Sequence, residues 1–210
     1  MLPTLNFYGN HTLDFENSEI NDLEKYAILE LRKLPIPEAV LQIVYNSLEK
    51  QFQGAALSKL SDIEDWCPVS FPGNPDFYDK YPKKNILTFG PMGMRIVITP
   101  QHIILPSIIY ERIDWYSPQN KEKVEAIRQY YNTVINHFGG DHALYVDEGI
   151  TKKYDYSEHK PKESTLGEFE QWLIARYGTN KKTLLDYAHG EYPKYYIDHF
   201  PDLKPEDNQQ

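Results

Sequence analysis

The sequence predicts an α+β fold: an N-terminal helical hairpin, a small, mostly antiparallel sheet, one long helix packed on the sheet, and a helical C-terminal cap. Apolar residues recur at helical spacing in residues 22–52 and again in residues 117–138, which is typical of amphipathic helices. Short β-branched runs separated by turn residues fill residues 86–105, which is typical of strands. Helices and strands do not alternate along the chain, so a doubly wound nucleotide-binding fold is not expected.

The helical hairpin is expected in residues 1–53. Its first helix, over residues 22–34, carries Leu23, Ala27 and Leu31 on one face. This helix ends before Pro35, because a residue that precedes proline is pushed out of the helical region. Pro37 suits the first turn of a second helix, and so short a connection predicts an antiparallel or angled hairpin of the two helices.

Residues 54–84 are rich in proline and are expected to form a long loop. Such a segment in a compact domain is usually a binding loop or lid, and aromatic residues here can alternatively cover the edge of the core. If the loop is a binding surface, its aromatic side chains are candidate stacking platforms of a carbohydrate- or peptide-binding module: Trp66, Phe71, Phe77 and Tyr78.

Residues 85–210 are expected to form the α+β core of a single domain that spans residues 1–210. Three strands are expected at 86–89, 95–99 and 102–105, followed by the long helix, which ends at Gly139 and Gly140. A strand at 143–146 leads into a polar loop or edge hairpin over 147–163. Thr165 and Glu168 have capping-box spacing and open a helix that Gly178 closes. A short helix at 181–189 and an aromatic run up to residue 200 follow, and residues 201–210 are expected to fray.

Composition and charge exclude several classes of function. The 210 residues include 22 Lys and Arg against 31 Asp and Glu, a net charge of −9, which argues against a nucleic-acid partner. The single cysteine, Cys67, rules out an internal disulfide framework. The sequence shows neither a secretory signal nor a run of eighteen apolar residues, so a cytoplasmic protein without a membrane partner is expected.

Motifs for catalysis or cofactor binding do not emerge from the sequence. It has no P-loop, no dinucleotide-binding glycine pattern and no G-x-S-x-G nucleophile elbow. Cys67 precedes a proline, and the sequence identifies no base to activate it. We therefore assign no catalytic residue and no cofactor, and the protein is not expected to be an enzyme.

A metal-dependent hydrolase is the first alternative. The densest group of possible ligands is Asp141 and His142, followed by Asp147 and Glu148 at the far end of the same strand. The strand separates its two ends by well over 10 Å (about 3.3 Å per residue), so one ion would need one pair and a distant histidine. Solvated turns at both strand ends explain the same residues.

The leading hypothesis is an interaction protein. Seventeen tyrosines accompany the acidic charge; tyrosine is enriched at interfaces, and acidic charge speeds the encounter with a basic partner. The same charge also serves solubility. The candidate partner-binding residues lie in the polar stretch after the strand at 143–146: Asp147, Glu148, Tyr154, Asp155, Tyr156 and Glu158.

Residues 137–148 (HFGGDHALYVDE), followed by residues 165–178 and 195–198, resemble the C-terminal half of bacterial immunity-type proteins. In those proteins a long helix ends in a glycine turn, and a strand and capping helices follow. The resemblance implies a protein that sequesters a toxin domain made by the same cell lineage, and it transfers no functional residue. We therefore expect an immunity or antitoxin protein that binds and occludes a basic effector domain, with its oligomeric state left open.

Overall fold

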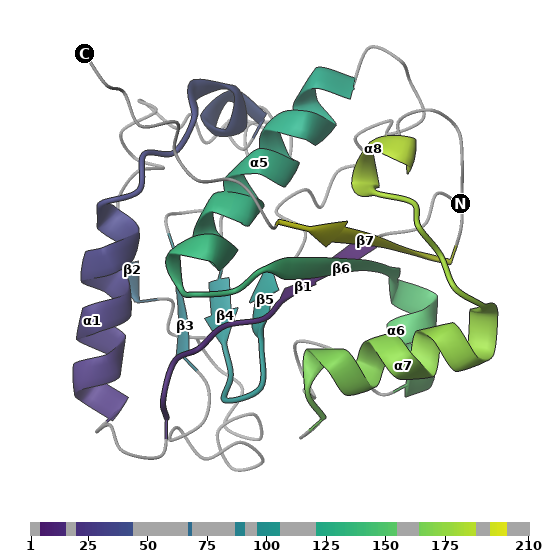
Figure 1. Cartoon of the computed structure of the whole chain (residues 1–210). Helices are drawn as coiled ribbons and strands as arrows, with labels where there is room; N and C mark the ends of the chain where they lie inside the picture. Colours follow the sequence, from purple (N-terminus) through teal and green to yellow (C-terminus); the bar gives the residue numbers. More distant parts are fainter. Residues whose placement is uncertain are drawn as a thin grey trace, which may run out of the picture.

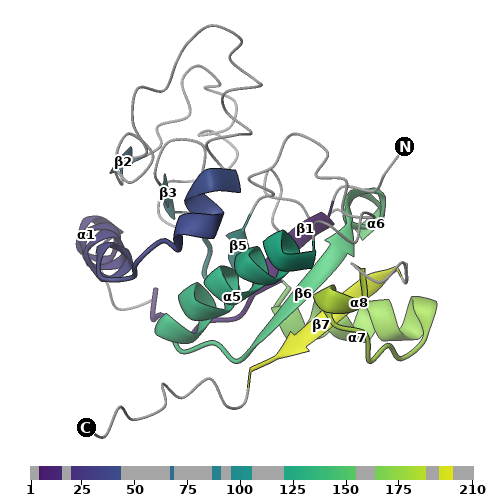
Figure 2. The ribbon, with the colours of Figure 1, turned by 90° about the horizontal axis from the view of Figure 1, so that it is seen from above.

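The computed structural model describes residues 5–15, 20–43, 67–68, 87–90, 96–105, 121–154, 164–187 and 194–200. Within them, an antiparallel sheet with strand order β2-β3-β4-β5-β1-β6-β7 lies between helices on its two faces (Figures 1 and 2). All neighbouring strands pair antiparallel. The α+β class with an antiparallel sheet is confirmed.

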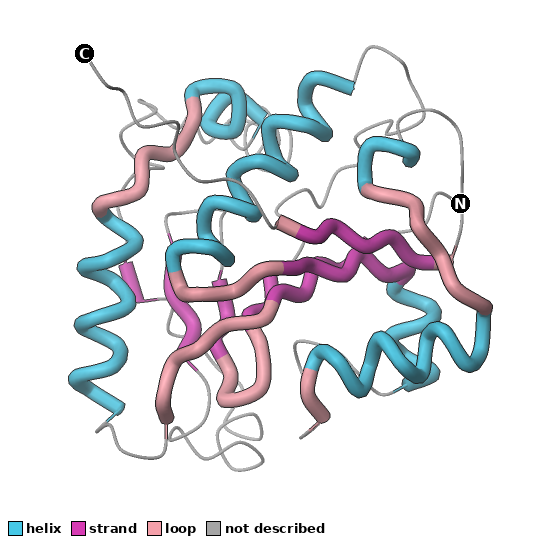
Figure 3. The backbone as a smooth tube through the Cα atoms, viewed as in Figure 1, coloured by secondary structure: helices cyan, strands magenta, loops and turns pink. Residues whose placement is uncertain are grey.

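The strands are short, and Figure 3 shows them in magenta between the cyan helices. Their bounds are β1 Leu5–Gly9, β2 Cys67–Pro68, β3 Leu87–Gly90, β4 Ile96–Ile98, β5 Ile103–Leu105, β6 His142–Asp147 and β7 Tyr195–His199. The helices are α1 Ile20–Arg32, α5 Lys121–His137, α6 Glu148–Tyr154, α7 Leu166–Tyr177 and α8 Leu184–Tyr187, and residues 38–43 are also helical.

The sheet is buried on both faces. On one face, Ala143 and Tyr145 of β6 join a core with α1, residues 38–43, α5 and α8. On the other, Leu144 and Val146 pack with α6 and α7. Successive strand residues point to opposite faces, so double coverage buries apolar side chains at successive positions, as at residues 143–146 of β6, and removes the simple alternation of a half-exposed strand.

Helix α5 is the long helix that the sequence predicts, and its end confirms the expected glycine turn. Gly139 has φ 79°, its N–H donates to Asn136 O at 2.9 Å, and the Gly140 N–H donates to Ile135 O at 2.9 Å. These two bonds form a Schellman motif, which satisfies carbonyls at the helix end. A Cβ at Gly139 would lie 2.3 Å from Thr12 Oγ1, so the turn also lets the loop after β1 approach closely.

Helices were expected from the start of the chain, but the first element of the structure is a strand. Strand β1 precedes α1 and occupies the centre of the sheet, where Phe7 lies opposite Leu105 of β5 and Tyr145 of β6. Both partners are about a hundred residues or more away along the chain, so no local pattern indicates the pairing.

The C-terminal cap is not wholly helical. Residues expected to form an aromatic run are strand β7, which pairs along the length of β6, with Tyr145 opposite Tyr196. The outer edge of β7 is covered by the chain before α8, because the Ile197 N–H donates to Lys182 O at 2.9 Å. Residues 148–154, expected as loop or edge hairpin, form α6.

The remaining local predictions agree with the structure. The expected strands at 86–89, 95–99 and 102–105 correspond to β3, β4 and β5. Helix α7 begins with the predicted capping box: Thr165 accepts from the Glu168 N–H, Glu168 accepts from the Thr165 N–H, and Gly178 follows the helix. Most of the expected loop 54–84, and the tail 201–210, lie outside the described residues. None of the helices in the described ranges has the length and apolar character needed to cross a membrane.

Candidate functional site

The two ends of β6 carry the polar residues that the sequence analysis selected. At one end, Asp147 Oδ1 accepts the Gly149 N–H at 2.8 Å, a local bond at the start of α6. Glu148 and Tyr154 are the first and last residues of α6. The other expected partner-binding residues lie outside the described residues: Asp155, Tyr156 and Glu158. This end of β6 therefore shows a carboxylate engaged in a local turn.

The opposite end of β6 forms a more organised cluster. Asn10, in the loop after β1, donates from Nδ2 to Asp141 Oδ1 at 2.7 Å. Asn10 Oδ1 accepts the backbone N–H groups of Asp141 at 2.9 Å and His142 at 3.1 Å. His142 Nδ1 lies 2.9 Å from the same Asp141 Oδ1. One amide side chain and one imidazole thus fix the orientation of the Asp141 carboxylate.

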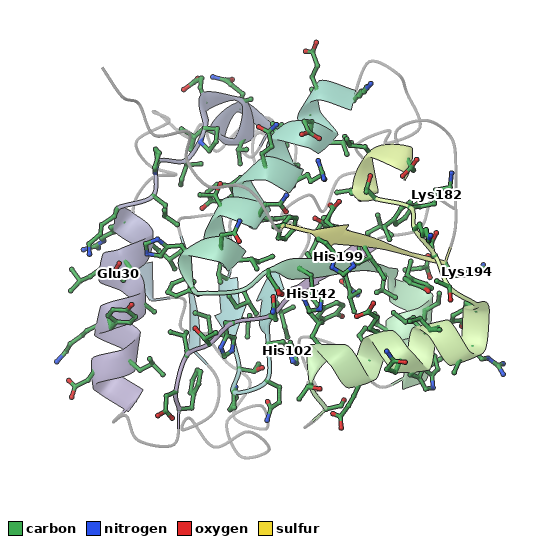
Figure 4. The ribbon with its side chains drawn as sticks, viewed as in Figure 1. Glu30, His102, His142, Lys182, Lys194 and His199 are labelled. Atoms are coloured by element: carbon green, nitrogen blue, oxygen red, sulfur yellow. The ribbon has the colours of Figure 1, made fainter. Side chains whose placement is uncertain are left out.

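Two further side chains complete this cluster. His142 and His199 occupy opposite positions on β6 and β7, and their rings stack with centroids 5.8 Å apart; Figure 4 shows them close together. Glu170 of α7 approaches from the facing helix, with Oε2 3.9 Å from His142 Nε2. We call Asn10, Asp141, His142, Glu170 and His199 the Asp141 cluster.

The Asp141 carboxylate is both exposed and held in place. Its side chain is 74% exposed, whereas those of His142 and Glu170 are 17% and 19% exposed. Hydrogen bonds from His142 and then from Asn10 lower the pKa of Asp141 below its ordinary value. The carboxylate is therefore ionised at neutral pH, and it is available to a partner in a fixed orientation.

Catalysis through His142 does not fit this geometry. Its Nδ1 is engaged with Asp141, and its Nε2 is buried and has no hydrogen-bond partner among the described residues, so a substrate has no access to that nitrogen. Within the described ranges, no three His, Cys, Asp or Glu side chains are arranged to hold a metal ion. Asp141 and Asp147 lie at opposite ends of β6, as the strand length predicts.

A second pair of histidines lies where the loop after β1 meets the β4–β5 turn. His11 Nε2 is 2.6 Å from Thr99 O, and the Leu13 N–H donates to His11 Nδ1 at 3.1 Å. These bonds select the neutral tautomer with the proton on Nε2. Burial lowers the pKa of His11, and burial followed by the charge of His11 lowers the pKa of His102 to about 3.

The most buried charge in the described residues is Asp198 of β7, which is fully buried. Arg128 of α5 binds it through two bonds, Nε to Oδ2 at 2.7 Å and Nη2 to Oδ1 at 2.9 Å. This bidentate pair ties α5 to the last strand. Because burying an unpaired carboxylate is costly, the pair specifies the register of β7 against α5.

The tyrosine content has a structural explanation that weakens its use as an interface signal. Most tyrosines with described side chains are in the core, each at most 2% exposed: Tyr8, Tyr130, Tyr131, Tyr145, Tyr195 and Tyr196. Phe7 packs edge-on against both Tyr131 and Tyr145, with ring centroids 5.1 and 5.0 Å apart. In this part of the chain, tyrosine fills the core.

The proposed stacking platforms lie outside the described residues: Trp66, Phe71, Phe77 and Tyr78. Cys67 is in the edge strand β2, where its backbone pairs with Gly90. Asn10 and Glu170 were missed from the sequence, and His199 was considered only as one of the distant histidines that could join a metal site. Each comes from a different element, and no spacing in the sequence links them to Asp141.

The chain was compared with models of protein families, with curated proteins and with solved structures, and none of them matches it.

Proposed function

We propose that this chain is an immunity-type interaction protein that binds and occludes a basic effector domain, with Asp141 as an anchoring carboxylate. The observation that carries the proposal is the geometry of Asp141. Its carboxylate is largely exposed, yet two side chains, Asn10 and His142, converge on one of its oxygens.

A carboxylate that is oriented before binding loses little conformational entropy when it meets a partner. An Arg or Lys side chain of the effector would form a charge-assisted hydrogen bond with it. The net charge of −9 supports the same class of partner, because opposite long-range charge accelerates association and disfavours acidic competitors.

Protection against an effector tests the function. The effector would be the basic C-terminal domain of a secreted protein encoded beside this chain's gene. We expect co-expression of the chain to restore growth of cells that make this domain. Titration of the purified domain should reach full inhibition at one chain per effector. A neighbourhood without such a gene, or an effector that stays active with excess chain, would contradict the proposed function.

The role of Asp141 is tested separately with Asp141→Asn. The amide can still accept from Asn10 and His142, so the variant removes charge and keeps shape. We expect the dissociation constant to rise about tenfold or more, equivalent to about 1.4 kcal/mol. Glu122→Gln, at an exposed position in the first turn of α5, is the control with the same change of charge. Equal affinities for the two variants would remove Asp141 as the anchor while leaving inhibition itself intact.

A further inference from the structure

The outer face of α1 exposes two apolar side chains. Among the residues that the structure describes, the exposed large hydrophobic side chains are Tyr26, at 47%, and Leu29, at 58%. They are three residues apart and therefore adjacent on the helix surface. Leu23, Ala27 and Leu31 are buried against the core on the opposite side, so Tyr26 and Leu29 face away from the protein. In Figures 1 and 2, α1 lies at the periphery of the described structure.

The charged residues on this face are placed so that the face can pair with a reversed copy of itself. Asp22 is one turn before Tyr26, and Lys33 is one turn after Leu29, immediately past the last residue of α1; both charged residues are exposed, and Lys33 also pairs with Glu30 of its own chain. The stripe Asp22, Tyr26, Leu29 and Lys33 therefore has spacings of four, three and four residues, which read the same from either end. Reversing the helix places acid opposite base and Tyr opposite Leu.

We propose that α1 docks antiparallel against α1 of a second copy of this chain, around a two-fold axis between Tyr26 and Leu29. Tyr26 then packs against Leu29 of the second copy, and Asp22 meets Lys33 of the second copy. A two-fold interface uses the same patch on both chains, and this stripe satisfies that requirement for its apolar and its charged positions.

Other charges on the face set the strength of this contact. Lys25 and Arg32 are also exposed, so the face carries more positive than negative charge. Lys25 and Glu30 flank the stripe on its two sides, about 140° apart around the helix, so Lys25 does not meet Glu30 of the second copy. Glu30 is 18% exposed and contacts Lys33 and His137 of its own chain. An acidic partner would pair with the cations of this face but would be repelled by Asp22. A second copy can instead pair both Asp22 and Lys33 with opposite charges. The small apolar patch predicts a weak, reversible dimer.

Sedimentation velocity of the full chain between about 5 and 500 µM covers the range in which so small an interface dissociates. We expect the average mass to rise towards that of a dimer. Leu29→Asp should raise the dissociation constant at least tenfold, because it places a charge at the centre of the contact. Gln171→Asp, at an exposed position of α7, is the control and should leave association unchanged. A wild-type chain that stays monomeric throughout would overturn the proposal.

A charge exchange identifies the register. Asp22→Lys places Lys opposite Lys, and Lys33→Asp places Asp opposite Asp, so each single variant should weaken the dimer. The double variant restores opposite charges and should recover most of the affinity. Circular dichroism checks that every variant remains folded, and Leu29→Asp decides the location of the contact if an exchange variant unfolds. Association that Leu29→Asp leaves intact, or a folded double variant no tighter than the single ones, would overturn this interface.

Discussion

Lowering the pH from 7 to 5 is expected to destabilise the fold by about 2 kcal/mol through His102 alone. This side chain is fully buried next to Tyr8, with ring centroids 6.0 Å apart. Burial is the main reason that its pKa falls from 6.5 to about 3. The unfolded chain therefore takes up a proton near pH 6.5, while the folded chain resists it until about pH 3.

The sign follows from which state binds the proton. Between those two values the unfolded state holds more protons, so stability falls as the pH falls. The contribution of His102 is complete above about pH 6.5 and is progressively lost towards pH 3. His11 acts in the same direction, because burial also lowers its pKa and protonation of Nδ1 would break the bond from Leu13.

The assay is urea unfolding, followed by tryptophan fluorescence at pH 7 and pH 5. Between pH 7 and pH 5, the free energy of unfolding of His102→Gln should fall by about 2 kcal/mol less than that of the wild type. This difference does not depend on how much the substitution destabilises the protein at pH 7. Gln171→Ala, at an exposed position of α7, changes no titratable group and should behave like the wild type. If His102→Gln and the wild type lose the same free energy on acidification, the assignment of this pH dependence to His102 is wrong.

Three substitutions test other contacts by thermal and urea unfolding at pH 7. Asp198→Asn removes the buried partner of Arg128 and should cost roughly 3 kcal/mol, because it leaves this largely buried cation with only its partly exposed partner, Glu125. Gly139→Ala should cost about 2 kcal/mol, because it combines a positive φ with a Cβ 2.3 Å from Thr12 Oγ1. Thr165→Ala removes the N-cap of α7 and should cost about 1 kcal/mol.

Each of these substitutions has a matched control. Glu125→Gln alters a partly exposed partner of Arg128 and should change stability by less than about 1 kcal/mol. Gly167→Ala, whose new Cβ would be 4.0 Å from its nearest neighbour, should stabilise α7 by up to about 1 kcal/mol. Glu168→Gln keeps the capping box and should be nearly neutral. A control that costs as much as its test variant would contradict the contact assigned to that variant.

Local chemistry made some elements predictable. Helix α5 ends where Gly139 can adopt a positive φ, and α7 begins where Thr165 and Glu168 exchange hydrogen bonds. Each of these signals depends on residues within one or two turns of each other. The strands β3, β4 and β5 were similarly indicated by adjacent β-branched runs and turns.

Strands β1 and β7 were not predictable because their stability is non-local. In β1, both Phe7 and Tyr8 are buried, since helices cover both faces of the sheet, and the alternation of a half-exposed strand is lost. In β7, Asp198 interrupts an apolar run. It is tolerated because Arg128, seventy residues earlier, provides two charge-assisted hydrogen bonds.

The Asp141 cluster likewise combines neighbours that the sequence indicates with distant contacts that it does not. The neighbouring positions of Asp141 and His142 could be seen in the sequence, and they were selected as possible ligands. What determines their chemistry comes from Asn10 after β1, Glu170 in α7 and His199 in β7. Those contacts make the carboxylate rigid and enclose the imidazole, which favours binding over proton transfer at this position.

Charge and position make separate contributions to the proposed recognition of a basic partner. Much of the excess negative charge belongs to residues outside the described ranges, so the consequence that we expect from it is a long-range field, which would act on encounter and be screened by salt. The orientation of Asp141 would act after encounter, because a fixed carboxylate would form a short-range bond that must break before the proposed complex dissociates. The tyrosines contribute to neither step where they are buried. The proposed binding function would therefore depend on where one carboxylate is held, whereas the tyrosine content that first suggested it mostly describes how the described core is packed.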